Sequence, residues 1–137
     1  MKEYINVGNI SKEKLGKYKE RLITEEVILT YERMNTHIHV YHKNEYEQVK
    51  DYINKIIEEP DYILEDNSHV DTLIFLKHIK EINKKVRIVI KLATDSKEKI
   101  YNKNSIITIM RQRDKSWKQT LKNKGEIIFD KNMDIKE

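Results

Sequence analysis

Hydrophobic positions between residues 11 and 59 recur mainly at the three- and four-residue spacings of amphipathic helices. Ser11 can cap a first helix, Thr30 a second, and Asn44 a third that stops before Pro60. In the second helix this spacing directs His37 inward with three apolar side chains, namely Met34, Ile38 and Tyr41. Segment 4–10 alternates as a short strand, and segment 27–29 suits either a strand or a helix entry.

After Pro60 the period changes to short runs rich in β-branched residues, separated by polar connections. These runs predict strands at 61–66, 72–79, 86–93, 104–111 and 126–130. Helices followed by consecutive strands with short links predict an α+β fold, in which N-terminal helices pack on one face of an antiparallel sheet. The other face of that sheet would remain open for a ligand.

Alternation along the strands sorts the side chains between the two faces of the sheet. Lys91 shares a face with Arg87 and Val89, which is an unusual place for a lysine among apolar residues. In the next strand, alternation places Thr108 with Ile106 and Met110, opposite Ser105, Ile107, Ile109 and Arg111. Thr108 and Arg111 are therefore expected on different faces, with Arg111 acting from the strand end.

The composition indicates a single folded domain over residues 1–137, with 131–137 as a flexible tail. The chain has no cysteine, which excludes a disulfide framework, thiolate catalysis and cysteine-type zinc sites. The N-terminus lacks the apolar run of a signal peptide, and no stretch approaches the roughly 20 apolar residues of a membrane helix. We expect a cytoplasmic protein without a membrane partner, although delivery into another cell stays open.

The charge is distributed unevenly, although the net value is only +4. Residues 97–125 contain nine Lys or Arg against two acids, and residues 44–71 contain nine acids against two lysines. A basic end of this kind suits a polyanion such as nucleic acid, and a solvated lysine-rich surface is the alternative explanation. Three of the five histidines lie between His37 and His42, where they offer groups that titrate near neutral pH.

Three short motifs occur in a characteristic order. They are His37-Ile-x-x-x-His42 after Glu32-Arg33, a helix that ends Glu-Pro60-Asp61-Tyr-Ile, and Asn104-Ser-Ile-Ile-Thr108. In this order the chain resembles the phage-associated members of the barnase/EndoU/colicin/RelE-like (BECR) nuclease group. The resemblance covers about residues 5 to 130. His39 is outside that pattern, and Tyr41 stands where the pattern usually has arginine.

The resemblance implies N-terminal helices on a four- to five-stranded antiparallel sheet and the activity of a metal-independent endoribonuclease without a cofactor. Such proteins are often toxins carried by phages or other mobile elements. The resemblance points to His37, Lys91 and Thr108 as the catalytic residues. The implied partners are RNA, with tRNA among the candidates, and a cognate inhibitor or immunity protein.

The implied reaction is attack of a ribose 2′-hydroxyl on the adjacent phosphate, which needs a base, an acid and donors to the phosphate oxygens. An unperturbed imidazole, with a pKa of about 6.5, suits His37 for either proton transfer. Lys91 would act by its charge and Thr108 by its hydroxyl. The remaining candidates for substrate binding are Arg33 as a phosphate clamp, His42 as the complementary acid, Arg111, and Trp117 with Lys118 for base stacking.

Each candidate also has a purely structural interpretation. His37 could be a hydrogen-bonded core histidine, His42 a helix-end histidine, and Trp117 the anchor of a C-terminal loop. Lys91 suits an edge strand, and Thr108 is a good strand former. A metal site is not expected, because His37 and His39 would point to different sides of a helix. The competing functions are a noncatalytic nucleic-acid-binding or phage structural accessory protein, and an antitoxin or protein-interaction domain that uses the acidic segment.

Overall fold

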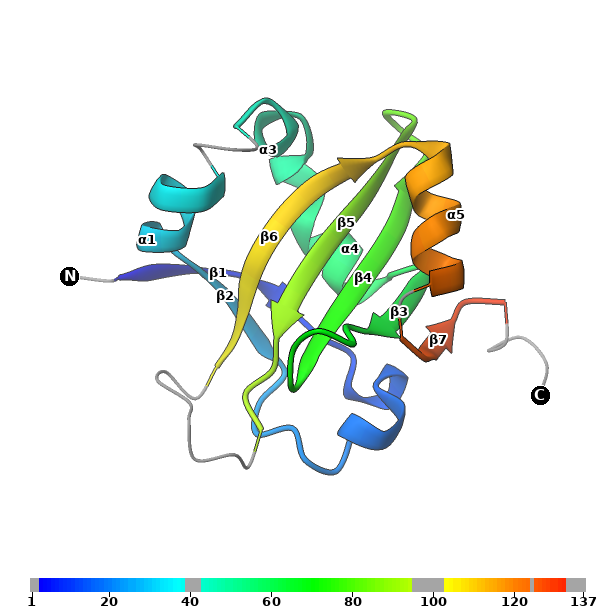
Figure 1. Cartoon of the computed structure of the whole chain (residues 1–137). Coiled ribbons are helices and arrows are strands. Elements are labelled where there is room, and N and C mark those ends of the chain that lie inside the picture. The colour runs from blue at the N-terminus through cyan, green and yellow to red at the C-terminus, as the bar shows by residue number, and fades with distance from the viewer. Residues whose placement is uncertain (1–2, 39–42, 95–102, 124, 133–137) are drawn as a thin grey trace.

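One mixed sheet organises the chain. The computed structural model describes residues 3–38, 43–94, 103–123 and 125–132. Within them, seven strands are ordered β1-β2-β6-β5-β4-β3-β7 (Figure 1). All neighbours pair antiparallel except β2 and β6, which are parallel. The strands are β1 (Tyr4–Asn9), β2 (Glu26–Thr30), β3 (Tyr62–Glu65), β4 (Thr72–Ile79), β5 (Lys84–Lys91), β6 (Asn104–Gln112) and β7 (Ile127–Asp130).

Helices cover both faces of this sheet. In Figure 1, α4 lies behind the strands, whereas α5 lies at their right-hand end. The α-helices are α1 (Tyr31–Arg33), α3 (Lys43–Val49), α4 (Ile53–Glu58) and α5 (Asp114–Asn123). Shorter turns are the 3₁₀ segments η1 (Lys12–Lys14), η2 (Gly16–Tyr18) and η4 (Lys50–Tyr52), and the π-helical segment η3 (Met34–Ile38).

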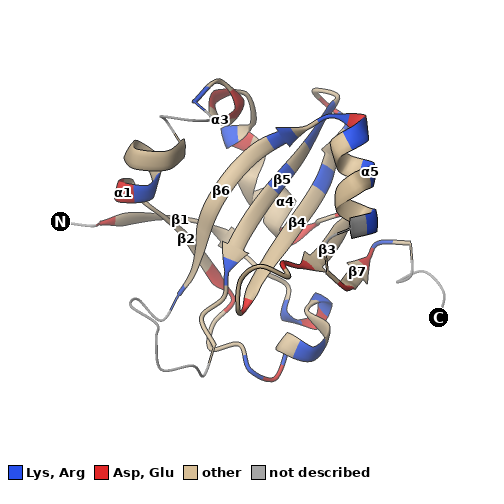
Figure 2. Cartoon of the chain, viewed as in Figure 1, with Lys and Arg blue, Asp and Glu red and all other residues tan. Residues whose placement is uncertain are grey.

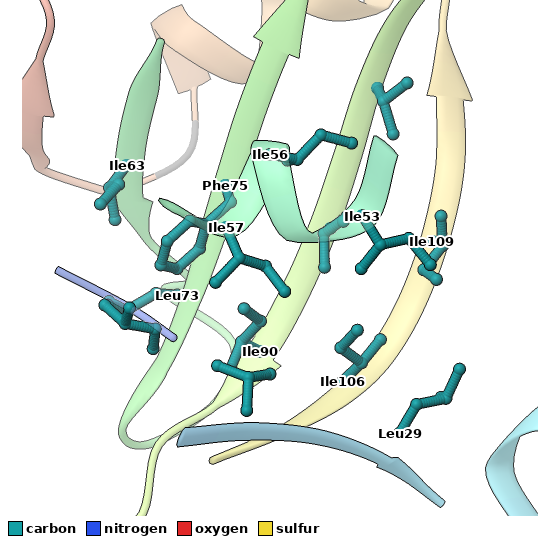
Figure 3. Packing of buried hydrophobic residues seen from close by; sticks show 14 of the residues in the cluster. Leu29, Ile53, Ile56, Ile57, Ile63, Leu73, Phe75, Ile90, Ile106 and Ile109 are labelled. Carbon is teal, nitrogen blue, oxygen red and sulfur yellow. The ribbon is translucent and has the colours of Figure 1, made fainter. Parts of the chain in front are cut away.

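The main core lies between the helices α3 and α4 and one face of the sheet (Figure 3). Apolar residues from α4 meet alternate residues of the central strands, as the sequence pattern predicts. The buried members include Ile53, Ile56, Ile57, Leu73, Phe75, Val86, Ile88, Ile90, Ile106 and Ile109. Their enclosure supplies the largest stabilising contribution to the fold.

A second, smaller core lies on the opposite face of the sheet, under α5. Trp117 and Leu121 of this helix pack against apolar residues of three strands. The buried strand residues are Leu64, Ile74, Leu76 and Val89. Because β3 to β5 are apolar on both faces, each face requires a cover. The expectation that helices occupy only one face is therefore wrong.

The expected count of four to five strands is also wrong, because β1 and β2 join the same sheet as the five later strands. The sheet is not purely antiparallel either, since β2 pairs with β6 in parallel. The C-terminal connection after β6 contains the helix α5, which the sequence pattern did not predict. Of the tail expected over 131–137, residues 133–137 lie outside the described residues.

The first expected helix is replaced by the two short turns η1 and η2. Ser11 makes no side-chain capping bond, and Gly16 adopts a left-handed conformation with φ 54°. A residue in that conformation ends a right-handed helix, and glycine adopts it without steric cost. The helical spacing of apolar residues in this segment indicated a buried face of Leu15, Tyr18, Leu22 and Ile23, of which the first three are buried and Ile23 is 45% exposed.

Asn104 joins three segments of the chain at the start of β6. Its side chain is fully buried. Its Oδ1 accepts the backbone N–H of Ala93 at 2.8 Å. Its Nδ2 donates to the backbone carbonyls of Thr24 at 2.8 Å and Glu26 at 2.9 Å. One amide therefore ties the end of β5 to the beginning of β2, across the only parallel pair of the described sheet.

We predict that Asn104→Ala lowers the free energy of unfolding by about 3 kcal/mol or more. The reason is that three hydrogen bonds are lost and their backbone partners stay behind without replacement. Chemical denaturation monitored by circular dichroism would measure this loss. The matched control is Asn54→Ala on the exposed surface of α4, which should change stability by less than about 0.5 kcal/mol. Equal stability of the two variants would contradict the role given to Asn104.

Candidate active site

His37 is positioned by the short helical turn that follows β2. The turn begins at Thr30, whose Oγ1 accepts the backbone N–H of Arg33 at 3.0 Å. Thr36 donates its hydroxyl to the carbonyl of Glu32 at 2.7 Å. The fully buried Ile38 anchors the π-helical segment in the main core, which holds the neighbouring His37 against β6. π-Helical turns of this kind occur frequently at functional sites.

The imidazole of His37 reaches Thr108 on the central strand β6. His37 Nε2 lies 3.3 Å from Thr108 Oγ1, and the tautomer decides which of the two donates. His37 is partly exposed, whereas Ile38 beside it is buried. The prediction that this face points inward is therefore correct for Ile38. It is wrong for His37, whose imidazole meets the hydroxyl of Thr108 on β6 and does not enter the core. Tyr41, expected on the same face, lies outside the described residues.

A bulge in β6 decides which way Thr108 points. Thr108 is in register with Val89, but Ile106 is in register with Ile90, so Ile107 is an extra residue in β6. As a result Ile106 and Ile109 both belong to the main core, and Ile107 packs in the second core. The alternation expected across Ile106, Thr108 and Met110 is therefore correct for Thr108 and Met110 and wrong for Ile106, which lies on the opposite face.

An open cavity of about 510 Å³ lies beside the pair of His37 and Thr108. Two cationic side chains, one carboxylate, one imidazole and several hydroxyl groups line it. Its lining residues are Thr30, Glu32, Arg33, Thr36, His37, Lys91, Ser105, Ile106 and Ile107. Lys91 is exposed at the end of β5, in register with Ser105 on β6. The cavity thus combines proton-transfer groups, positive charge and hydroxyl donors.

The structure brings four of the predicted site residues together: His37, Lys91, Arg33 and Thr108. Arg111 is exposed at the end of β6, in register with the core residue Val86, so it lies on the face opposite Thr108. Its backbone N–H donates to Glu45 at 2.9 Å. His42 and His39 lie outside the described residues.

Trp117 lies on α5 and does not line the cavity. Its ring packs in the second core and meets Tyr62 edge-on, with 6.0 Å between ring centroids. This placement agrees with the structural interpretation of Trp117 as an anchor, here of a helix and not of a loop. Lys118 is exposed on the same helix.

Six lining residues were not predicted as site residues, and Glu32, Thr36 and Ser105 are three of the four polar ones, beside the capping residue Thr30. Glu32 and Thr36 are within five positions of His37, so the helix spacing could have indicated them. Ser105 could not be identified in the same way. Its position across from Lys91 depends on the register between β5 and β6.

The acidic segment 44–71 is largely used in structural ion pairs. Asp61 is buried and lies 3.2 Å from Lys131 and 3.6 Å from Lys77. Hydrogen bonds from Lys17 and Tyr18 lower the pKa of the Glu65 carboxyl. Burial and the same carboxylate raise the pKa of Tyr18 to about 12. These pairings give the buried carboxylates of the acidic segment a structural role.

Basic residues, by contrast, occur on β5, on β6 and along α5 (Figure 2). Among the described residues, no group of three or more His, Asp or Glu side chains is arranged to hold a metal ion. The same part of the chain contains no helix with the length and apolar character required to cross a bilayer.

Comparison with known sequences identifies the family of the chain. No curated protein and no solved structure matches the chain significantly. A family profile described as phage-Barnase-EndoU-ColicinE5/D-RelE-like nuclease, PBECR2, matches residues 7–130. That match spans β1 to β7 almost completely and includes every residue that lines the cavity. The chain is therefore a member of the phage-associated BECR-like nuclease family PBECR2.

Proposed function

We propose that this nuclease cleaves RNA without a metal ion, by attack of a ribose 2′-hydroxyl on the adjacent phosphate. The observation that carries the proposal is the contact between His37 Nε2 and Thr108 Oγ1 beside a cavity lined by Lys91 and Arg33. A proton-transfer group, a hydroxyl donor and two cations are the components that this reaction needs. The membership of a nuclease family supports a phosphodiester as the substrate.

In the proposed step, the 2′-oxygen forms a bond to phosphorus while the bond from phosphorus to the 5′-oxygen breaks. One group removes the proton of the 2′-hydroxyl, and another supplies a proton to the departing 5′-oxygen. His37 performs one of these transfers. Glu32, the carboxylate that lines the same cavity, is suited to the other. His42, expected as the complementary acid, lies outside the described residues.

The remaining groups stabilise the negative charge that develops on the nonbridging oxygens. Thr108 can donate its one hydroxyl hydrogen to a phosphate oxygen when His37 Nε2 donates to Thr108 Oγ1, or when the phosphate displaces His37. Lys91 contributes a point charge, and Arg33 can bind two phosphate oxygens at once. The product is a 2′,3′-cyclic phosphate and a new 5′-hydroxyl.

A noncatalytic nucleic-acid-binding or phage structural accessory protein is the second candidate. Such a protein would need the cations but not an imidazole paired with a strand hydroxyl. Measurements of RNA binding and RNA cleavage separate the two proposals. An enzyme loses cleavage when His37 is replaced, whereas a binding module cleaves no RNA with or without His37.

The phage association of the family supports a role as a toxin or effector carried by a mobile element. We propose that it acts on cytoplasmic RNA, with tRNA among the targets, in the producing cell or in a recipient. Such a toxin requires a cognate inhibitor or immunity protein in the producing cell.

We predict that His37→Ala reduces RNA cleavage at least about 10²-fold, which is the lower range of general acid–base contributions. Purified protein would be incubated with total RNA and tRNA in EDTA, and fragment ends would be analysed for 2′,3′-cyclic phosphate. The matched control is His69→Ala, since His69 lies in an exposed loop, where it pairs with nearby Asp66 at 3.2 Å. This control should cleave as the unmodified protein does.

A substrate with one 2′-deoxy residue at the cleaved position should resist cleavage, because the nucleophile is missing. Cleavage of that substrate would contradict transesterification. Intact RNA with every variant, combined with salt-dependent RNA binding, would instead support the noncatalytic proposal.

We predict that Thr108→Val reduces the rate of cleavage about 10- to 10³-fold, because one donor to the phosphate oxygens is lost. Valine has a similar shape and a high strand propensity, so the melting temperature should change little. Thr108→Ser, which restores the hydroxyl, should recover most of the activity. Equal loss in both variants would show that the methyl group, and not the hydroxyl, matters.

A further inference from the structure

Arg87 lies beside the candidate active site, on the face of the sheet that α5 covers only in part and that we call the open face. It is in register with Leu76 on β4 and with Met110 on β6. Val89, the next residue of β5 on that face, is in register with Thr108. Arg87 and Thr108 are therefore diagonal neighbours, with Cα atoms about 7 to 8 Å apart. Figure 1 shows this part of β5 and β6 between the helical turn of α1 and the helix α5.

The guanidinium of Arg87 has no partner within the described part of the chain. Its Nε is buried and makes no hydrogen bond. Burial lowers the pKa of the guanidinium, and the charge of Asp66 acts in the opposite direction without an ion pair between the two. Arg21, in comparison, reaches both carboxylate oxygens of Asp71 at 3.2 Å. Arg87 is thus a partly buried charge that feels Asp66 but makes no ion pair with it, and whose buried Nε makes no hydrogen bond among the described residues.

Such a charge reduces the stability of the free protein, because desolvation is not offset by a partner. An anion that reaches the open face would remove this penalty when it binds. A guanidinium matches the geometry of a phosphate, to which it can donate two parallel hydrogen bonds. Arginine remains charged at neutral pH even when its pKa is lowered moderately.

The position of Arg87 indicates which phosphate it would meet. Lys91 lies four residues away on the same face of β5, which corresponds to about 13 Å. Lys91 lines the cavity of His37, but Arg87 does not. Arg87 lies outside the cavity that holds the reacting phosphate, one diagonal step beyond Thr108, so it suits a neighbouring phosphate of the same strand.

We propose that Arg87 binds a substrate phosphate that flanks the scissile one, so that the RNA strand crosses β5 and β6 from Lys91 towards Arg87. This inference rests on the proposed function for the reacting phosphate. Arg87 would be a binding residue that contacts the substrate backbone away from the reacting atoms. It follows that Arg87 contributes to the affinity for longer RNA and not to the chemical step.

The test compares Arg87→Met with Lys80→Met, which removes one positive charge from an exposed turn. Methionine retains much of the apolar stem of Arg87. Two RNA substrates are used, a dinucleotide with one phosphate and a tetranucleotide with three. For Arg87→Met, kcat/KM on the tetranucleotide should fall about tenfold to a hundredfold through KM, as expected for one charge-assisted contact. On the dinucleotide it should stay unchanged, and Lys80→Met should match the unmodified protein on both substrates.

Stability gives an independent measurement. If Arg87 serves to bind the substrate and does not stabilise the fold, Arg87→Met should leave the melting temperature unchanged or raise it. The reason is that an unpaired charge is removed. A clear loss of stability with unchanged KM on the tetranucleotide would overturn the proposal, since Arg87 would then be structural. An equal loss on both substrates would overturn it as well, because Arg87 would then act on the reacting phosphate.

Binding separates this inference from the proposed function. The affinity for a tetranucleotide with 2′-deoxy residues, which cannot be cleaved by transesterification, is measured by fluorescence anisotropy at several salt concentrations. Weaker binding by Arg87→Met, with a salt slope reduced by about one, supports the inference even if no variant cleaves RNA and the proposed function fails. Unchanged binding together with normal cleavage by the unmodified protein would overturn the inference alone.

Discussion

The register of β6 is the constraint on which both the sheet and the candidate site depend. Asn104, its first residue, bonds to the backbone on both sides, at Ala93 and at Thr24 and Glu26. A shift of β6 by one residue would leave this buried amide without these partners and would exchange the faces of every later side chain. With the start held, the extra residue Ile107 determines that Thr108 faces the open side, where His37 reaches it.

The two faces of the sheet serve different purposes. One face is filled by the main core under α3 and α4, and the other is only partly covered by α5. The acidic segment is engaged with lysines and Tyr18, so its charge is mainly structural. The cations of the open face are different, since the partly buried Arg87 has no ion pair in the described chain. A binding surface of this kind sacrifices some stability for affinity, as functional sites often do.

Most strands could be predicted from the sequence, because alternation and β-branched residues are local signals. The seven segments identified at the sequence level correspond to β1 to β7 within about two residues at each end, although 27–29 also suited a helix entry. The expectation of a four- to five-stranded sheet came from the family resemblance. That number is too low, because β1 and β2 belong to the same sheet as the other five strands. The helix α5 was missed because its charged residues obscure the two apolar contacts, Trp117 and Leu121, that hold it on the sheet.

The sequence by itself determined the local elements, the apolar faces of β4, β5 and α4, and the Thr30 cap that begins the turn carrying His37. The family resemblance selected His37, Lys91 and Thr108, but alternation alone placed Ile106 on the face of Thr108, where the structure has Ile107. Alternation also placed Arg111 correctly on the face opposite Thr108, but only the tertiary structure decided the parallel pairing of β2 with β6 and the bulge at Ile107. The physical reason is distance along the chain. His37 and Thr108 are 71 residues apart, and their contact depends on strand order and register, which follow from the packing of the whole sheet and not from any local pattern.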